Sequence, residues 1–271
     1  MQNSSGRGMD TSAAEYYDTI TVPEVFRPWA ELMVGAVPVQ KGMRTLDVAC
    51  GTGVVARCAA RLCGPLQGRS SGLDIDPAMI QVARAVARRE GLEIDYRCGP
   101  ASELPFEAAS FDAAFCLQGL QYFPDKSQAL AELRRVMRPG ARLVVVVWTD
   151  LETHAGNWAM LNALRRRGID AKDMLKPFAL SDSAGLQALA DKAGFEDVTV
   201  EVKHHTVRFA SAKAFVESVA QGAPSSRLAL ALVPSNEWQD FLADIEAQLA
   251  GHIKNGGLEF PMASNVLVAR R

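Results

Sequence analysis

The fold is decided by residues 46–56, which read Leu-Asp-Val-Ala-Cys-Gly-Thr-Gly-Val-Val-Ala. The apolar run from Thr45 to Ala49 carries one acid and predicts a buried strand, and the pattern that starts at Val54 predicts a helix. Cys50 to Gly53 forms a tight, glycine-rich turn between them. A strand, a glycine turn and a helix in this order begin a mononucleotide-binding α/β unit.

Three residues of this stretch predict contact with a ligand. Gly51 and Gly53 lack a Cβ, so the backbone can approach a ligand closely, and the following helix directs free N–H groups at it. We therefore expect Gly53→Val to fold but to bind the ligand poorly. Asp47 lies inside the strand, where a carboxylate is costly unless donors reach it. A ligand ammonium meets that need, directly or through water and backbone N–H groups.

A second acid ends the next predicted strand, Ser71 to Ile75. Asp74 follows the glycine turn by roughly twenty residues, which is the position of a ribose-binding carboxylate in such units. Asp76 is expected to cap the helix that opens at Pro77.

The remaining strands are predicted from apolar or alternating runs. They cover residues 93–98, 110–117, 143–148, 197–209 and 258–269. An amphipathic helix over residues 127–137 is expected to end at the turn Arg138-Pro139-Gly140.

Several of these stretches resemble motifs of class I S-adenosylmethionine (SAM)-dependent methyltransferases, in the small-molecule, ubiquinone/menaquinone-biosynthesis-like branch. They are the glycine turn, Gly72 to Met79, Gly99 to Phe106, Ser110 to Leu117 and Arg138-Pro139-Gly140. The resemblance covers about residues 40–150 with the motifs in order, which is far more specific than one glycine turn.

The resemblance implies SAM as the cofactor and S-adenosyl-L-homocysteine as its product. It also implies an α/β fold: a Rossmann-like, seven-stranded, mostly parallel sheet with an antiparallel last strand, N-terminal helices and a helical lid insertion. The implied cofactor-binding residues are Asp47, Ala49, Gly51, Gly53, Asp74, Ile75, Met79, Ala101, Ser102, Leu117, Gln118 and Tyr17.

Within this set, Ile75 and Met79 are expected to flank the adenine ring. Tyr17 either closes over the SAM pocket or packs on the sheet edge, whereas Phe26 and Trp29 are expected to pack on the sheet edge.

The sequence departs from the family at Pro100. The family commonly has an Asp there, which accepts a hydrogen bond from the adenine amino group. Pro100 has neither a side-chain acceptor nor a backbone N–H. The adenine must then be held by the Ala101 N–H, the Ser102 hydroxyl or Glu103.

The loop after residues 110–117 bears on the acceptor. Enzymes that methylate nucleobase amino groups carry Asn/Asp-Pro-Pro-Tyr/Phe here, and this chain has Cys-Leu-Gln-Gly at 116–119. Gln118 and Gln121 either orient a polar substrate atom or are merely solvated. His154 follows the fifth strand on the ligand side and is the candidate catalytic base, the alternative being a surface loop histidine.

The N-terminal segment is expected to be helical. Ser12 to Glu15 fits a capping box, a second helix is predicted near Pro23, and Pro28 must start a helix or kink one. The chain divides into a flexible tail (1–11), an N-terminal helical cap (12–40), a SAM-binding α/β core (41–210), a helical lid insertion (211–257) and the final strand of the core sheet (258–271).

Composition is ordinary for a soluble globular protein. The 271 residues are 48% hydrophobic and 22% charged with a net charge of −2, and no basic block or long apolar run occurs. We therefore expect no nucleic-acid partner, no membrane contact and a cytoplasmic location for a monomer or homodimer. The five cysteines are expected to be small buried residues, and no metal is expected, because cysteine and histidine spacing fits no site.

The favoured interpretation is an enzyme that transfers a methyl group from SAM to a small, apolar or amphipathic metabolite. The acceptor atom stays open. One alternative is a protein of the same fold that binds SAM without methyl transfer. Another is a nicotinamide-dependent oxidoreductase, which predicts a parallel sheet without a terminal antiparallel strand.

Overall fold

The computed structural model describes residues 9–64, 69–222 and 224–271, so most of the expected tail, residues 1–8, lies outside the described residues. Its sheet has eight strands in the order β3-β2-β1-β4-β5-β8-β6, with β7 paired to β8 beside this path. The strands are β1 (Arg44–Val48), β2 (Arg69–Asp74), β3 (Ile94–Cys98), β4 (Phe111–Leu117), β5 (Met137–Trp148), β6 (Glu196–Phe209), β7 (Ile253–Lys254) and β8 (Gly257–Arg270).

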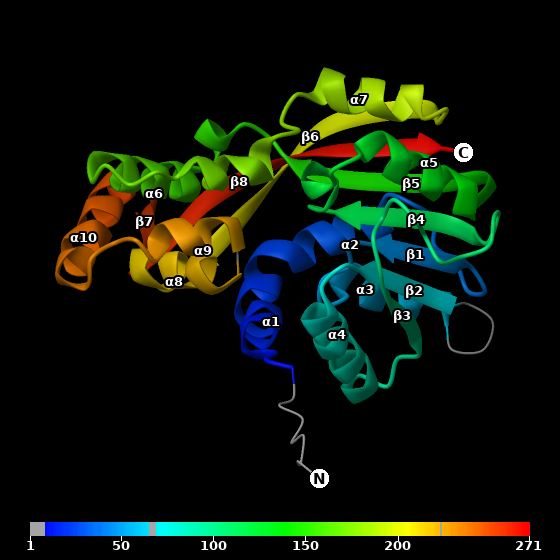
Figure 1. Cartoon of the computed structure of the whole chain (residues 1–271), viewed down its shortest axis with the longest axis horizontal. Coiled ribbons are helices and arrows are strands. Elements are labelled where there is room, and N and C mark those ends of the chain that lie inside the picture. The colour runs from blue at the N-terminus through cyan, green and yellow to red at the C-terminus, as the bar shows by residue number, and fades with distance from the viewer. Residues whose placement is uncertain (1–8, 65–68, 223) are drawn as a thin grey trace, which may run out of the picture.

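The first five strands are parallel, so their carboxyl ends meet at one edge of the sheet (Figure 1). β1 lies centrally, and Asp47 on it pairs with Gly72 of β2 and Phe115 of β4. Parallel strands that are covered on both faces consist largely of continuous apolar residues. The apolar runs in the sequence therefore predicted these strands.

Helices cover both faces of the sheet. Val144 and Val146 of β5 pack into one core while Val145 and Val147 pack into the other, because successive side chains point to opposite faces. One face carries α2 (Arg27–Gly35), α3 (Val54–Cys63) and α4 (Pro77–Arg89), and the other carries α5 (Lys126–Val136) and α7 (Ser183–Lys192).

The carboxyl-terminal strand runs antiparallel, as predicted. β8 lies between β5 and β6 and is antiparallel to both. This arrangement contradicts the purely parallel sheet that the oxidoreductase alternative predicts. The sheet has eight strands rather than seven because Asn255 and Gly256, with φ of 51° and 79°, turn β7 back onto β8. Asn-Gly is a strong hairpin signal, and our strand prediction missed it.

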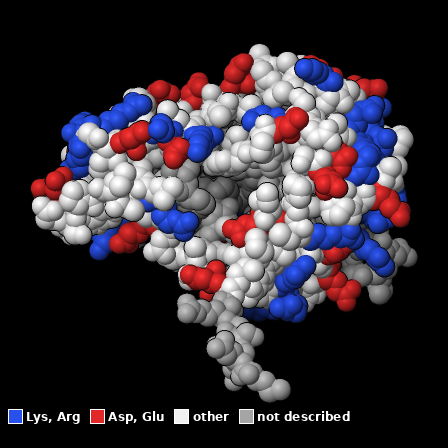
Figure 2. All heavy atoms as spheres, viewed as in Figure 1, with Lys and Arg blue, Asp and Glu red and all other residues white. Residues whose placement is uncertain are grey.

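A helical lobe surrounds the far halves of β6 and β8, beyond the carboxyl ends of the parallel strands (Figure 1). Its members are α6 (Ala155–Arg166), η4 (Lys172–Phe178), α8 (Ala212–Gly222), α9 (Pro224–Leu230), η5 (Ser235–Glu237), α10 (Trp238–Gln248) and η6 (Ala250–His252). The expected insertion supplies α8 to β7, and α6 and η4 come from before β6. Figure 2 shows a hollow between this lobe and the N-terminal helices.

The N-terminal segment is one continuous helical stretch of three parts. They are α1 (Ser12–Tyr16), a π-helix, η1 (Tyr17–Phe26), and α2. The second part begins at Tyr17 rather than near Pro23, which lies inside it. Pro28 opens α2 in the first turn, where its missing N–H costs nothing, so that prediction is confirmed.

The capping-box prediction is wrong. The N-cap residue is Thr11, and Ser12 already has a helical position. The Thr11 hydroxyl donates to Glu15 Oε1 (2.7 Å), and Asp10 Oδ1 accepts the Ser12 N–H (3.0 Å). Asp10 therefore takes the acceptor role that the pattern gave to Ser12.

The turn predicted at Arg138-Pro139-Gly140 is instead part of β5. Met137 pairs with Phe111 and Arg142 pairs with Ala113, and the residues between form an irregularity in the strand. Gly140 has a φ of 82° and donates its N–H to the Arg271 carbonyl (2.8 Å), which holds this bulge against the last strand.

Two of the five cysteines depart from the expected burial. Cys50, Cys63 and Cys116 are buried, but Cys58 is half-buried and Cys98 is exposed on β3, the edge strand. Across the described ranges, no helix is long and apolar enough to cross a membrane, and no three His, Cys, Asp or Glu side chains group as metal ligands.

Candidate cofactor site

The glycine turn joins β1 to α3 at the carboxyl edge of the sheet. Ala49, Gly51 and Gly53 have φ of 57°, 54° and 83°, so the turn is built from left-handed residues. The Cys50 N–H donates to the Leu73 carbonyl (3.0 Å), and the Gly53 N–H donates to the Cys50 carbonyl (2.8 Å). These bonds attach the turn to β2 and fix its shape before any ligand binds.

The two glycines are constrained for different reasons. A Cβ on Gly51 would lie 3.7 Å from Tyr17 Cε1, an ordinary contact, whereas one on Gly53 would lie 2.1 Å from the Tyr96 hydroxyl. Gly53→Val can fold only if the Tyr96 ring moves, and Tyr96 is buried beneath the turn, so the structure does not support the expectation that this variant folds. Only Gly51 retains the argument from close ligand approach.

Asp47 is buried and incompletely bonded. Its Oδ2 accepts the Ala56 N–H (3.0 Å) in the first turn of α3. Its Oδ1 is buried with no hydrogen-bond partner. Desolvation raises the pKa of this carboxyl to about 8. An acceptor of this kind fits an ammonium donor, which satisfies the free oxygen and favours the ionised form.

Asp74 ends β2 directly opposite the turn. Its Oδ2 accepts the Gly51 N–H (2.8 Å) and its Oδ1 accepts the Asp76 N–H (2.9 Å). Burial raises its pKa from the usual carboxyl value. A carboxylate has about four acceptor positions, so each oxygen can accept one further hydrogen bond from a pair of hydroxyls. Asp76 caps α4 through the Ala78 N–H (2.8 Å), as predicted.

The N-terminal helices bring Tyr17 to the turn. Its ring lies beside Gly51 and 5.3 Å from the ring of Phe26. Burial, with a contribution from Asp74, raises the pKa of its hydroxyl. Phe26 in turn lies 6.2 Å from Trp148 of β5. Trp29 packs edge-on against Trp148 (6.0 Å), so its predicted packing on the sheet is confirmed.

A buried ion pair, which the sequence analysis missed, attaches these helices to the turn. The Arg57 guanidinium is paired with Asp18 of η1 at 3.1 Å and donates to the Thr52 carbonyl inside the turn. Arg57 is 2% exposed, and its Nε lies 3.5 Å from Glu90 Oε2 at the end of α4. The sequence did hold one indication of this ion pair, because Arg57 lies among apolar residues in the helix of residues 54–63.

The residues expected around the adenine lie at the rim. Ile75 is 71% exposed, Met79 is half-buried, and Ala101 is half-buried. Ser102 and Pro100 are exposed, and the Gly99 N–H donates to the Asp74 carbonyl (2.9 Å), which places this loop beside Asp74.

The end of β4 is rigid and polar. Leu117 is nearly buried, and Gln118, with a φ of 53°, turns its side chain into the protein. Its Oε1 accepts from the Trp148 N–H (3.0 Å) and Gln121 Nε2 (3.0 Å), and its Nε2 donates to Ser264 Oγ (3.2 Å). Neither glutamine is solvated, and Gln121 Oε1 is buried without a partner.

His154 is fully buried, so the alternative of a surface loop histidine is wrong. Its ring lies edge-on to Trp148 (5.2 Å) and to Phe178 (5.1 Å). Nε2 is 3.4 Å from the Thr149 hydroxyl, and Nδ1 is buried without a partner. Desolvation lowers the pKa of His154 to about 4, so the ring is neutral at pH 7.

Comparisons with known proteins agree with this geometry. Residues 46–145 match a family described as a methyltransferase domain. The ubiquinone/menaquinone biosynthesis C-methyltransferase UbiE of Bordetella avium is 35% identical over 141 residues, which are 51% of this chain and 55% of that protein. The chain thus spans about half the length of the curated relatives it matches.

Solved structures support the fold. The YcgJ protein of Bacillus subtilis aligns with a TM-score of 0.60 at 18% identity, covering 89% of this chain and 97% of that one. Phosphoethanolamine N-methyltransferase 2 of Haemonchus contortus, solved in complex with SAM, aligns with a TM-score of 0.61 at 18% identity, covering 97% and 57%.

The fold and the matches point to one class: residues 46–145 match a methyltransferase domain, and the fold is the one found in solved SAM-dependent methyltransferases. SAM is the cofactor of this class. Residues 46–145 are thus similar to the methyltransferase-domain family, and the same part of the chain is similar to the UbiE C-methyltransferases.

Proposed function

We propose that this protein transfers the methyl group of SAM to a small, apolar or amphipathic acceptor. The observation that carries the proposal is the buried Asp47 carboxyl, whose Oδ1 has no partner although it adjoins the glycine turn. A buried acceptor without a donor costs about 1–3 kcal/mol, which a bound ammonium group recovers.

The cofactor is held from three sides in this proposal. Asp47, together with the turn at Ala49, Gly51 and Gly53, binds the methionine part, and Tyr17 covers it. Asp74 accepts from the ribose hydroxyls. The residues around the adenine and along the β4 end are Ile75, Met79, Ala101, Ser102, Leu117 and the Gln118 backbone.

When bound, SAM supplies an electrophilic methyl group on its sulfonium. The chain's own contribution is to hold the two reactants in line and to exclude water. The rings of Tyr17, Phe26 and Trp148 form apolar walls next to the turn, which supports this role. Gln118 contributes by fixing the ends of β4 and β5 relative to each other.

His154 is the proposed general base for an acceptor that is a poor nucleophile. Its Nδ1 has no partner, so it can accept a proton from a group that reaches it. Its lowered pKa keeps the ring unprotonated but makes it a weak base. An acceptor that is already nucleophilic does not need it.

Calorimetric titration of the full chain with S-adenosylhomocysteine tests the cofactor site. We expect Asp74→Ala to weaken binding roughly tenfold to a hundredfold, because it removes charge-assisted hydrogen bonds worth about 1.5–3 kcal/mol. Asp191→Asn, an exposed carboxylate on α7, is the matched control and should bind as the wild type does. Unchanged affinity in Asp74→Ala would dismiss the ribose assignment.

Methyl transfer itself is tested by incubating the protein with SAM and panels of phenolic, quinol, amine and carboxylate acceptors, with S-adenosylhomocysteine measured as product. Tight binding of SAM without product from any acceptor would contradict the proposal. It would favour the alternative, a protein of this fold that binds SAM without transferring its methyl group.

A further inference from the structure

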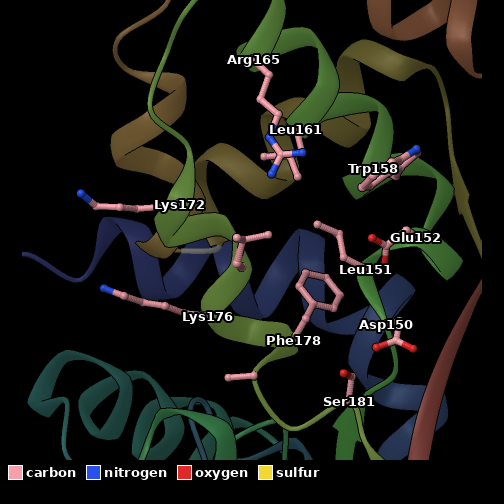
Figure 3. Close-up of a pocket in the computed structure, with 12 residues that line it drawn as sticks. Asp150, Leu151, Glu152, Trp158, Leu161, Arg165, Lys172, Lys176, Phe178 and Ser181 are labelled. Atoms are coloured by element: carbon pink, nitrogen blue, oxygen red, sulfur yellow. The ribbon is translucent and has the colours of Figure 1, made fainter.

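A second concave site opens immediately after β5. It is a pocket of about 600 Å³ between η3 (Leu151–Thr153), α6 and η4 (Figure 3). It begins at the carboxyl end of a central parallel strand, the edge at which open α/β sheets bind ligands. The proposed cofactor residues do not line it.

One wall of this pocket is apolar. Leu151, Trp158, Leu161 and Phe178 line it, and Leu175 of η4 is 42% exposed at its mouth. Covering apolar surface of this kind contributes about 25 cal/mol per Å². The wall therefore favours an alkyl or aromatic ligand group over water.

Charge is segregated across the pocket. Arg165 extends from α6 with its guanidinium directed into the pocket (Figure 3), and this group has no partner among the residues that the structure describes. Lys172 and Lys176 lie on the η4 side, and Asp150 and Glu152 lie on the opposite side.

The two lysines are only weakly engaged. They form exposed ion pairs within their own segment, Lys172 with Asp170 (3.1 Å) and Lys176 with Asp173 (2.8 Å). Exposed pairs of this kind contribute little, so these cations can turn toward an anion.

A row of rings joins this pocket to the glycine turn. Phe178 lines the pocket and lies 5.1 Å from His154, which lies 5.2 Å from Trp148. Trp148 lies 6.2 Å from Phe26, and Phe26 lies 5.3 Å from Tyr17 beside Gly51. A chain of ring contacts therefore runs from the pocket to the cofactor turn through the buried rings of His154 and Trp148.

We propose that this pocket binds a single-chain amphipathic carboxylate. The carboxylate lies at Arg165 and the two lysines, and the chain lies along Trp158 and Phe178. Asp150 and Glu152 repel the anionic end and so orient the ligand with its other end toward β5. We further infer that the methyl acceptor belongs to this chemical class, an inference that rests on the proposed function.

Decanoate is a suitable probe, with decanol as the neutral molecule of the same chain length. Both are titrated into the full chain, and binding is followed by calorimetry and by tryptophan fluorescence. We expect decanoate to bind more tightly than decanol. Arg165→Gln should weaken decanoate binding about tenfold and leave decanol binding unchanged. Trp158→Phe should abolish most of the fluorescence response.

Arg88→Gln is the matched control, because Arg88 is an exposed arginine of α4 far along the chain from this pocket. It should leave decanoate binding unchanged. Decanoate binding no tighter than decanol binding, or equal in Arg165→Gln and the wild type, overturns the proposal.

S-adenosylhomocysteine separates this inference from the proposed function. The acceptor and the cofactor must bind together, so saturating S-adenosylhomocysteine should leave decanoate affinity unchanged or raise it. Competition between them overturns the acceptor assignment. Failure of S-adenosylhomocysteine to bind while decanoate binds overturns the proposed function and leaves the anion pocket intact.

Discussion

The Arg57 guanidinium and the Asp18 carboxylate form an ion pair at 3.1 Å in which the two side chains are only 3% and 7% exposed. The pair joins α3, the helix that follows the glycine turn, to the π-helix that carries Tyr17. Arg57 also donates to the Thr52 carbonyl. One side chain therefore contacts both the turn and the N-terminal helices.

Removing one partner of this pair should cost more than removing both. Arg57→Met leaves the buried Asp18 carboxylate uncompensated, and we expect it to lower the free energy of unfolding by about 3–5 kcal/mol. Asp18→Asn should cost less, because Glu90 still lies 3.5 Å from Arg57 Nε. The double variant should recover a large part of this loss. Urea unfolding of all four proteins measures the coupling.

The same variants report on the site. Asp18→Asn should weaken S-adenosylhomocysteine binding, because Tyr17 loses its support next to Gly51. The exposed pair Arg97–Asp95, at 2.8 Å, provides the control, and Asp95→Asn should change neither quantity. Equal stability of Asp18→Asn and the wild type would show that the pair contributes nothing.

Pro100→Asp should tighten SAM binding. Pro100 is exposed at the rim beside Asp74, so a carboxylate has room there and can accept from the adenine amino group. One such hydrogen bond contributes about 1 kcal/mol or somewhat more, or roughly fivefold to tenfold in affinity. Calorimetry on the variant measures this change.

Two results would count against that expectation. Weaker binding together with a less stable fold would make Pro100 a backbone requirement of its loop. Unchanged affinity, with Ser102 or Glu103 bonded to the amine in a complex structure, would mean that the contact has been replaced.

Local patterns predicted the parallel half of the sheet well. The strand of Asp47, the glycine turn and the strand ending in Asp74 form one unit between Arg44 and Asp74, and both acids reach the predicted edge. Their roles follow from chain direction and sheet geometry, which a sequence displays directly.

The missed features depend on contacts between distant parts of the chain. The Arg57–Asp18 pair joins residues 39 apart, and Tyr96 meets Gly53 across 43 residues. No local pattern predicts either contact. Asn255-Gly256 is different, since its hairpin signal is local and was overlooked.

His154 should reduce stability in acid. Its folded-state pKa, about 4, lies below the ordinary value of 6.5, so the unfolded chain binds more protons between these values. The contribution to stability is present above pH 6.5 and is lost as the pH falls toward 4. It amounts to about 3 kcal/mol for a shift of this size.

Comparison with a variant that lacks the imidazole separates the contribution of His154 to the free energy of unfolding from the contributions of other titrating groups. The free energy of unfolding of the wild type should fall relative to that of His154→Leu as the pH is lowered from 7 to 4.5. A difference that stays constant with pH would show that His154 is protonated inside the folded protein without penalty.

Asp47 should make cofactor binding depend on pH. Its pKa in the free protein is about 8, so the carboxyl is mostly protonated at neutral pH and below. Binding of an ammonium group favours the carboxylate and must therefore release a proton. Below the ligand's own α-amino pKa of about 8, affinity should rise with pH, by roughly thirtyfold between pH 5.5 and 7.0.

Calorimetry with S-adenosylhomocysteine in two buffers of different ionisation enthalpy counts the released proton. Asp47→Asn retains an acceptor for the Ala56 N–H but cannot titrate, so its weaker binding should lose most of this pH dependence. Burial also raises the pKa of Asp74, so a small dependence should remain. A wild-type affinity that is flat with pH, with no proton released, would mean that Asp47 stays protonated and that the ammonium binds elsewhere.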